Sequence, residues 1–231
     1  MLRGIFSKPS LIDETRDLLR RALDNPQGDF RAGQWEAIEQ LVEQRARLLV
    51  VQRTGWGKSM IYFLATKLLR KRGAGPTLLI SPLLALMRNQ MLAAERLELQ
   101  AATINSSNTE EWDAVREQLN RNEVDLLLIS PERLANDKFR EQTLTQFVGS
   151  VGLLVVDEAH CISDWGHDFR PDYRRIVRIV RMLPKNTPVL TVTATANDRV
   201  VEDAAAQLGS SFKIMRGPLG RESLRLQNIF L

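Results

Sequence analysis

Residues 47–59 read RLLVVQRTGWGKS, and this stretch decides the fold class. The run RLLVV is short and rich in branched apolar residues, which predicts a buried parallel strand. The glycines that follow predict a loop, and the apolar pattern from Ser59 to Arg72 predicts a helix. A strand, a glycine-containing loop, Lys-Ser and a helix in this order are typical of a loop that binds phosphate groups.

Each residue type in this loop suits phosphate chemistry. Gly55 and Gly57 allow backbone N–H groups to face phosphate oxygens, beside the partial positive charge of a helix N-terminus. Lys58 is placed to reach the β and γ phosphates of a nucleotide, and Ser59 is placed to bind magnesium. The strict pattern has a glycine where this chain has Gln52, so a turn that happens to contain Gly-Lys-Ser stays the alternative.

A pair of carboxylates follows a second apolar run. Leu153 to Val156 predicts another buried strand, and Asp157 and Glu158 come directly after it. Several β-α units fit between Lys58 and Asp157, so both motifs are expected at the carboxyl edge of one sheet, where ligands bind in open α/β folds. Asp157 is then expected to hold the magnesium, and Glu158 to orient or deprotonate an attacking water. The alternative is that the two carboxylates only cap the next turn.

Short apolar strands alternate with amphipathic helices along the chain. The expected strands are Arg47 to Val51, Thr77 to Ile80, Asp125 to Ile129, Leu153 to Val156 and Val189 to Val192, with weaker candidates at Ala101 to Ile104 and Phe212 to Met215. The expected helices are Leu11 to Leu23, Gln34 to Gln44, Ser59 to Arg72, Leu84 to Leu97 and Thr109 to Asn122. This alternation predicts an α/β fold of three αβα layers with a mostly parallel sheet. The main domain is expected over residues 29–216, after a helical segment at 1–28 and before a tail at 217–231.

Composition and charge limit the possible functions. The net charge of +4 and the pI near 9.5 are compatible with nucleic-acid binding but are too modest to indicate it alone. Cys161 is the only cysteine, which excludes a disulfide framework and a cysteine-rich zinc site. The sequence contains no secretory h-region and no apolar run that could span a bilayer. A cytoplasmic location, associated with the nucleoid in a bacterium, is therefore expected, without a membrane partner.

A series of ordered motifs makes the chain similar to a known family. It resembles the first motor domain of RecQ-family DNA helicases, in helicase superfamily 2, from about Leu18 to Leu231. The matching motifs are FRAGQ at 30–34, TGWGKS at 54–59, SPLLALMRNQ at 81–90, ISPERL at 129–134, DEAH at 157–160, SDWGHDFRPDY at 163–173 and TATA at 193–196. The resemblance implies a RecA-like fold of the P-loop class, with ATP and Mg²⁺ as cofactors.

The resemblance also implies how the base of ATP is bound. Arg31 is expected to stack on adenine and Gln34 to bind its edge, since a planar guanidinium stacks well on rings. A tyrosine that commonly stacks from the other side aligns with Gln27, and the family's usual Pro and Gly are here Arg53 and Trp56. Trp56 is bulky, so it is expected to point away from the nucleotide. Four further motif residues receive roles: nucleotide binding for Thr54, catalysis for His160, and coupling for Thr193 and Thr195.

The aromatic-rich segment after DEAH is expected to bind DNA. The resemblance implies that this segment couples DNA binding to ATP hydrolysis, and aromatic rings with cations are typical of single-stranded DNA sites. The alternative is that its aromatic rings only pack against the core. The expected DNA contacts are Trp165, His167, Phe169 and Arg170, together with Arg88 and with Ser81 and Ser130, which precede predicted helices.

The leading prediction is the ATP-binding half of a DNA helicase motor. ATP hydrolysis is expected to drive movement along single-stranded DNA and unwinding at its junctions with duplex, with three-prime to five-prime polarity implied by the resemblance. Such motors bind ATP between two RecA-like domains, and the second supplies an arginine finger. No second set of motifs follows here, so a piece of a longer protein with weak activity alone is expected. Two alternatives stay open: an RNA helicase or duplex translocase, and a nucleotide-gated DNA-binding adaptor that does not hydrolyse ATP.

Overall fold

The computed structural model describes residues 10–82, 92, 94–104, 112–140, 144–163, 171–194, 197–209 and 211–218. Within these residues, seven strands form one sheet in the order β3-β4-β2-β5-β6-β1-β7, and all neighbouring strands run parallel. The expected parallel sheet is therefore confirmed. The strands are β1 (Arg47–Val51), β2 (Thr77–Ile80), β3 (Ala101–Ile104), β4 (Leu126–Ile129), β5 (Leu153–Val156), β6 (Val189–Thr193) and β7 (Phe212–Arg216).

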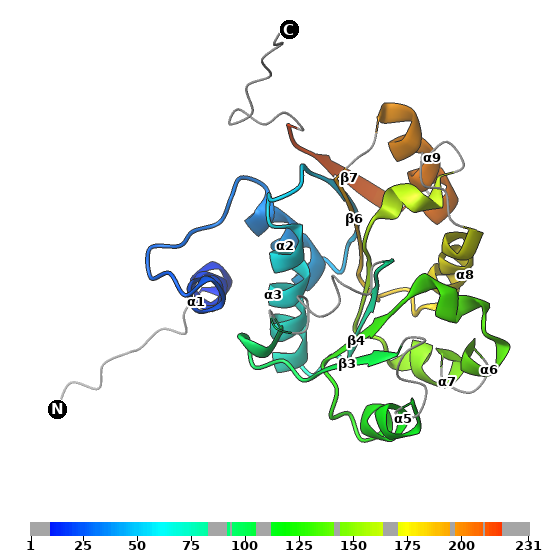
Figure 1. The fold of residues 1–231 in the computed structure, drawn as a ribbon. Helices are drawn as coiled ribbons and strands as arrows, with labels where there is room; N and C mark the ends of the chain where they lie inside the picture. The colour runs from blue at the N-terminus through cyan, green and yellow to red at the C-terminus, as the bar shows by residue number, and fades with distance from the viewer. Residues whose placement is uncertain are drawn as a thin grey trace, which may run out of the picture.

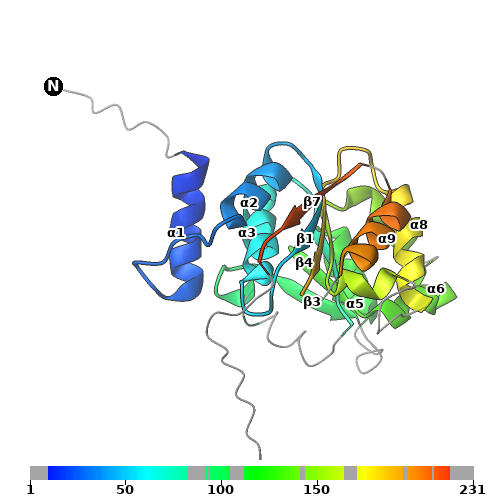
Figure 2. The same ribbon diagram turned by 90° about the horizontal axis from the view of Figure 1, so that it is seen from above.

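Helices cover both faces of this sheet, as Figure 1 and Figure 2 show. On one side lie α1 (Leu11–Leu23), α2 (Gln34–Val42) and α3 (Lys58–Lys71), with α1 outermost. The other side carries α5 (Trp112–Asn120), α6 (Asp137–Phe139), α7 (Thr145–Phe147), α8 (Arg174–Met182) and α9 (Asp198–Leu208). The predicted three-layer αβα architecture is confirmed.

Alternation along each strand builds two apolar cores, one on each face. In β1, Leu48 and Val50 belong to the core beneath α1, α2 and α3, whereas Leu49 and Val51 belong to the core on the opposite face. Because helices cover both faces, the strand needs apolar side chains at every position rather than at alternate ones. Burial of one such side chain stabilises the fold by about 1.5–3 kcal/mol.

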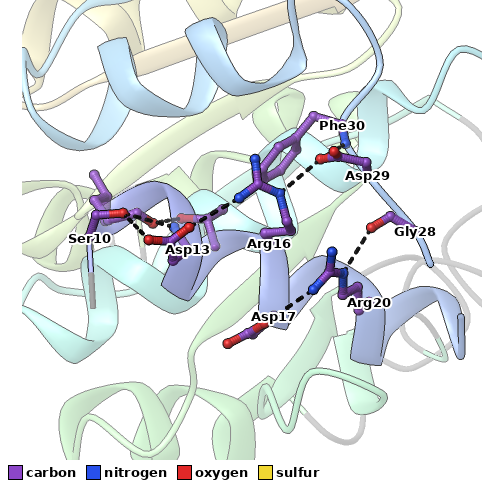
Figure 3. A network of polar contacts seen from close by, with 10 residues as sticks. Ser10, Asp13, Arg16, Asp17, Arg20, Gly28, Asp29 and Phe30 are labelled. Atoms are coloured by element: carbon purple, nitrogen blue, oxygen red, sulfur yellow. Dashed lines mark hydrogen bonds and ion pairs between the residues drawn. The ribbon is translucent and has the colours of Figure 1, made fainter. Parts of the chain in front are cut away.

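A polar network holds α1 to the segment that follows it (Figure 3). Arg16 Nε donates to Asp29 Oδ1 at 3.0 Å, and Arg16 NH1 donates to Asp13 Oδ1 at 3.1 Å. One turn later, Arg20 Nε donates to the Gly28 carbonyl at 3.1 Å. These contacts fix the path of the chain from α1 to the FRAGQ motif. Three buried residues of α1, Leu18, Leu19 and Ala22, join the core shared by α2 and α3.

Most predicted element bounds agree with the structure to within two residues. All seven strands form, including the two weaker candidates, and α1 spans the predicted residues. α3 begins at Lys58, one residue earlier than expected, with Gly57 in a left-handed conformation as its N-cap. The predicted helix Leu84 to Leu97 and the start of the predicted helix at Thr109 lie largely outside the described residues. None of the helices in the described part of the chain is long and apolar enough to cross a membrane.

Candidate functional site

Three neighbouring strands end together at one edge of the sheet. β5, β6 and β1 are adjacent and parallel, so Asp157, Thr193 and Gln52 lie at the same carboxyl edge. A backbone bond joins two of these strand ends, because the Gln52 N–H donates to the Thr193 carbonyl at 3.1 Å. The predicted phosphate loop and the predicted carboxylate pair therefore share one edge.

The loop between β1 and α3 depends on two glycines. Gly55 (φ 79°) and Gly57 (φ 97°) take left-handed conformations, which glycine adopts without the clash of a Cβ atom. A Cβ on Gly57 would also lie 2.6 Å from Gln34 Nε2. Thr54 and Ser59 are exposed on this loop and on the first turn of α3. The loop therefore presents an open helix N-terminus, which attracts anions.

Lys58 folds back over the loop. Its Nζ donates to the carbonyl of Gln52 at 2.8 Å and to that of Arg53 at 3.3 Å. Burial lowers the pKa of Lys58, while the nearby carboxylates of Glu158 and Asp157 act in the opposite direction. A cation beside a helix N-terminus and across from two carboxylates suits a polyanion that carries a metal ion.

Gln34 and Arg31 brace the phosphate loop. Gln34 is buried, and its Nε2 donates to the carbonyls of Trp56 at 3.1 Å and Gly57 at 3.2 Å. Its Oε1 accepts from the Arg31 N–H at 2.8 Å, and the Arg31 guanidinium donates to the Gly55 carbonyl. The FRAGQ motif is thus attached directly to the loop. The expected contacts of Arg31 and Gln34 with adenine stay a prediction, and they require these bonds to be exchanged.

Trp56 packs inside the protein. Only 7% of it is exposed, and it belongs to the core between the sheet and the helices α1 to α3. A cavity of about 480 Å³ lies beside it, lined also by Gln52, Met215 and Gly217. The buried Gln52 Oε1 has no hydrogen-bond partner in the part of the chain that the structure describes. Burial of the bulky indole leaves the exposed side of the loop clear, in keeping with the expected orientation of Trp56.

One of the two predicted catalytic carboxylates, Glu158, stands on strained backbone. Asp157 is buried, and its Oδ1 accepts from the Glu158 N–H at 3.0 Å. Glu158 has φ 53° and ψ 48°, a left-handed conformation that costs a non-glycine residue about 1–2 kcal/mol. Strain of this kind is concentrated at functional sites. The residue type does not predict this left-handed conformation, because glutamate does not favour positive φ angles.

Tyr173, which is not among the predicted site residues, also contacts the carboxylate motif. It is fully buried, and its hydroxyl donates to the Asp157 carbonyl at 3.0 Å. The contact spans 16 residues and depends on how the start of α8 packs against the strand ends. No local pattern predicts such a contact.

His160 connects the DEAH motif to the end of β6. Its Nδ1 lies 3.0 Å from Thr193 Oγ1 and 3.2 Å from Glu158 Oε2, and its Nε2 lies 3.6 Å from Cys161 Sγ. The Cys161 sulfur and the Glu158 carboxylate raise the pKa of His160 to about 10. A protonated imidazole donates from both ring nitrogens, which matches acceptors on both sides.

His160 is expected to stay protonated at neutral pH. Its folded-state pKa lies above the ordinary value of 6.5, so its protonation contributes stability that is complete below 6.5 and is lost as pH rises through about 10. The chain has only two histidines, so NMR of a His167→Gln variant would leave one imidazole to observe. Its chemical shift should stay constant from about pH 6 to 8, where an ordinary imidazole titrates. A titration midpoint near 6.5 would contradict the expectation.

The described DNA candidates lie at the same edge of the sheet. Ser81 follows β2 and is fully buried, and its Oγ has no hydrogen-bond partner among the described residues. Ser130 follows β4 and precedes a five-residue 3₁₀ helix, η2 (Pro131–Ala135), where an α-helix would have offered a longer row of N–H groups. Six other predicted site residues lie outside the described residues: Arg88, Trp165, His167, Phe169, Arg170 and Thr195.

Comparisons with known proteins agree with this geometry. A family profile described as DEAD/DEAH box helicase matches residues 31–204. The chain is 40% identical over 181 residues to the ATP-dependent DNA helicase RecQ of Bacillus subtilis, covering 78% of this chain and 29% of that protein. It is 36% identical over 209 residues to RecQ of Haemophilus influenzae, covering 90% of this chain and 31% of that protein. The chain thus spans less than a third of the length of either relative.

Solved structures show the same fold. The DEAD-box helicase Mss116 bound to ssRNA and UDP-BeF has a TM-score of 0.70 at 16% identity, covering 94% of this chain and 48% of that one. The Hef helicase domain of Pyrococcus furiosus has a TM-score of 0.62 at 20% identity, covering 86% of this chain and 40% of that one. At these identities the likeness concerns the fold alone, and it confirms the predicted RecA-like class.

Proposed function

The chain belongs to the DEAD/DEAH box helicase family, and from this membership we propose that it is the ATP-binding half of a DNA helicase motor. The observation that carries the proposal is the meeting of Lys58, Asp157 and Glu158 at one sheet edge, where burial and both carboxylates act on the lysine. This edge combines a site for phosphates with acidic groups for a metal ion and a water. The relatives named as ATP-dependent DNA helicases support ATP as the nucleotide.

Each residue at this edge has a separate role in ATP hydrolysis. Lys58 exchanges the loop carbonyls for the β and γ phosphates and offsets their charge. The Ser59 hydroxyl and the Asp157 carboxylate fit Mg²⁺, which prefers oxygen ligands and keeps several waters. A magnesium ion held by these oxygens would supply the Lewis-acid charge that favours attack on the terminal phosphate. Glu158 orients the attacking water and accepts its proton.

Two sets of contacts at this edge of the sheet can respond to bound nucleotide and bound DNA. Arg31 and Gln34 leave their bonds to the loop when they engage adenine, so base binding changes the restraint on the phosphate loop. His160 and Thr193 are 3.0 Å apart, which links the carboxylate motif to the strand that precedes the predicted coupling residue Thr195. We assign Thr193 and Thr195 to the coupling of nucleotide state with DNA state, as the family resemblance implies, and we propose that Arg31, Gln34 and His160 take part through these contacts.

The proposed nucleic acid is single-stranded DNA next to a duplex junction. The similarity to proteins named as DNA helicases supports DNA, and the segment SDWGHDFRPDY has the aromatic and basic residues that suit single strands. Three-prime to five-prime movement is part of the proposal. So is a second RecA-like domain that closes over the nucleotide, which fits a chain that spans less than a third of its relatives.

ATP hydrolysis by this chain is expected to increase when single-stranded DNA is added. The measurement is phosphate release with no nucleic acid, with a deoxythymidine oligonucleotide and with a uridine oligonucleotide of equal length. Stimulation by DNA above that by RNA supports the proposal, because phosphate contacts alone would not distinguish the two. Stronger stimulation by RNA would favour the RNA helicase alternative. ATP binding without hydrolysis in every arm would favour the nucleotide-gated adaptor.

A further inference from the structure

The peptide bond between Asp157 and Glu158 is held from both sides. Its N–H donates to Asp157 Oδ1 at 3.0 Å, and its carbonyl accepts from the Tyr173 hydroxyl at 3.0 Å. The Tyr173 bond is formed in a fully buried place, where water does not compete for the carbonyl. The orientation of this peptide is therefore fixed by one group from the strand end and one from the start of α8.

The fixed peptide explains how Glu158 can occupy a left-handed conformation. An L-residue at φ 53° and ψ 48° is strained, and it persists only where the surroundings impose it. The conformation turns the chain sharply after β5 and places Glu158 Oε2 3.2 Å from His160 Nδ1. If the Asp157 carbonyl lost its partner, the peptide could rotate toward an unstrained conformation and carry the Glu158 carboxylate with it.

We propose that Tyr173 is a positioning residue for Glu158, whose hydroxyl holds the Asp157–Glu158 peptide in the orientation that hydrolysis needs. The inference rests on the proposed function, in which Glu158 orients and deprotonates the attacking water. Tyr173 acts through the backbone and touches neither the nucleotide nor the water. Tyr173 is the last residue of the SDWGHDFRPDY segment. Its hydrogen bond to the Asp157 carbonyl therefore connects the end of that segment to the carboxylate motif.

Tyr173→Phe tests the hydroxyl without removing the ring. Single-turnover ATP hydrolysis, with the chain in excess over ATP and single-stranded DNA present, measures the chemical step even when turnover is slow. Loss of one hydrogen bond to the peptide is expected to lower this rate about 3- to 10-fold. ATP affinity, measured with a fluorescent nucleotide, should stay within about 2-fold, since the substitution leaves every side chain of the binding loop in place. The thermal midpoint should differ little from that of the wild type.

Tyr62→Phe is the matched control. The chain has only two tyrosines, and both are fully buried, but Tyr62 lies on α3 in the core on the opposite face of the sheet from Tyr173. Its substitution should leave the hydrolysis rate unchanged. An equal drop in both variants would mean that the loss of any buried hydroxyl disturbs the enzyme, and it would overturn the assignment.

A double variant locates the effect. If Tyr173 acts through Glu158, then Tyr173→Phe should cause no further loss when Glu158 is already Gln, because the two changes remove one function. Additive losses, an unchanged rate in Tyr173→Phe alone, or a parallel fall in ATP affinity and thermal midpoint would each overturn the inference and leave the proposed function intact. A wild-type chain that binds ATP but never hydrolyses it would instead overturn the proposed function, and the inference with it.

Discussion

Glu158→Gln is expected to reduce ATP hydrolysis by about a hundred- to ten-thousandfold, the range that a positioned general base contributes. Glutamine keeps the length of the side chain and its hydrogen-bonding capacity, but it cannot accept a proton from water. His160 keeps its contact with Thr193, 3.0 Å away, so the ring retains one of its acceptors. The substitution changes one charge near Lys58 but removes no side chain of the binding loop, and ATP affinity should therefore change little. The test compares single-turnover hydrolysis with the affinity for a fluorescent ATP analogue.

The matched control for this variant is Glu117→Gln. Glu117 is an exposed residue of α5, and its carboxylate lies 3.8 Å from Arg121. Surface pairs of this kind contribute about 0–1 kcal/mol, so both hydrolysis and stability should be close to wild type. Hydrolysis that survives Glu158→Gln would rule out Glu158 as the base. A variant that loses ATP binding as well would place Glu158 in binding rather than in the chemical step.

The fold could be predicted from the sequence because its strands are buried on both faces. A run such as Leu153 to Val156 lacks alternation, and only a covered parallel strand requires apolar side chains at every position. Strand order could not be predicted in the same way. No local pattern indicates that β6 lies between β5 and β1, and that placement brings Thr193 beside the phosphate loop.

Sequence motifs mark the residues of the candidate site by their type, but they do not mark the contacts that depend on the path of the folded backbone. Lys58 and Asp157 carry chemistry that a motif reveals, and their shared edge follows from parallel strands. The adenine contact of Gln34 stays a prediction, whereas its bond to the Trp56 carbonyl crosses 22 residues and appears only once the chain is folded. The left-handed backbone of Glu158 has the same origin, since no local preference of the sequence produces it.

Gly75→Ala is expected to cost about 2–4 kcal/mol of unfolding free energy, the scale of a severe steric conflict in a packed core. The segments before β2 and β5 touch through their backbones: a Cβ on Gly75 would lie 1.7 Å from the Ser150 carbonyl oxygen, and one on Gly152 would lie 2.2 Å from the Gly75 oxygen. Both contacts are with backbone, which cannot rotate away as a side chain can. The Gly152 N–H also donates to the Pro76 carbonyl at 2.9 Å, so separating the segments breaks the start of the strand pairing.

Gly149→Ala provides the control, because a Cβ at Gly149 would meet nothing within 4 Å. Urea unfolding followed by circular dichroism should give a free energy close to wild type for Gly149→Ala and a much lower one for Gly75→Ala. If both variants unfolded at the same urea concentration, the close approach of the two segments would not exist in solution. The conflict lies at the amino ends of β2 and β5, whereas Asp157 and Glu158 follow the carboxyl end of β5. Gly75→Ala molecules that remain folded should therefore bind ATP as the wild type does, which separates a loss of stability from a loss of the site.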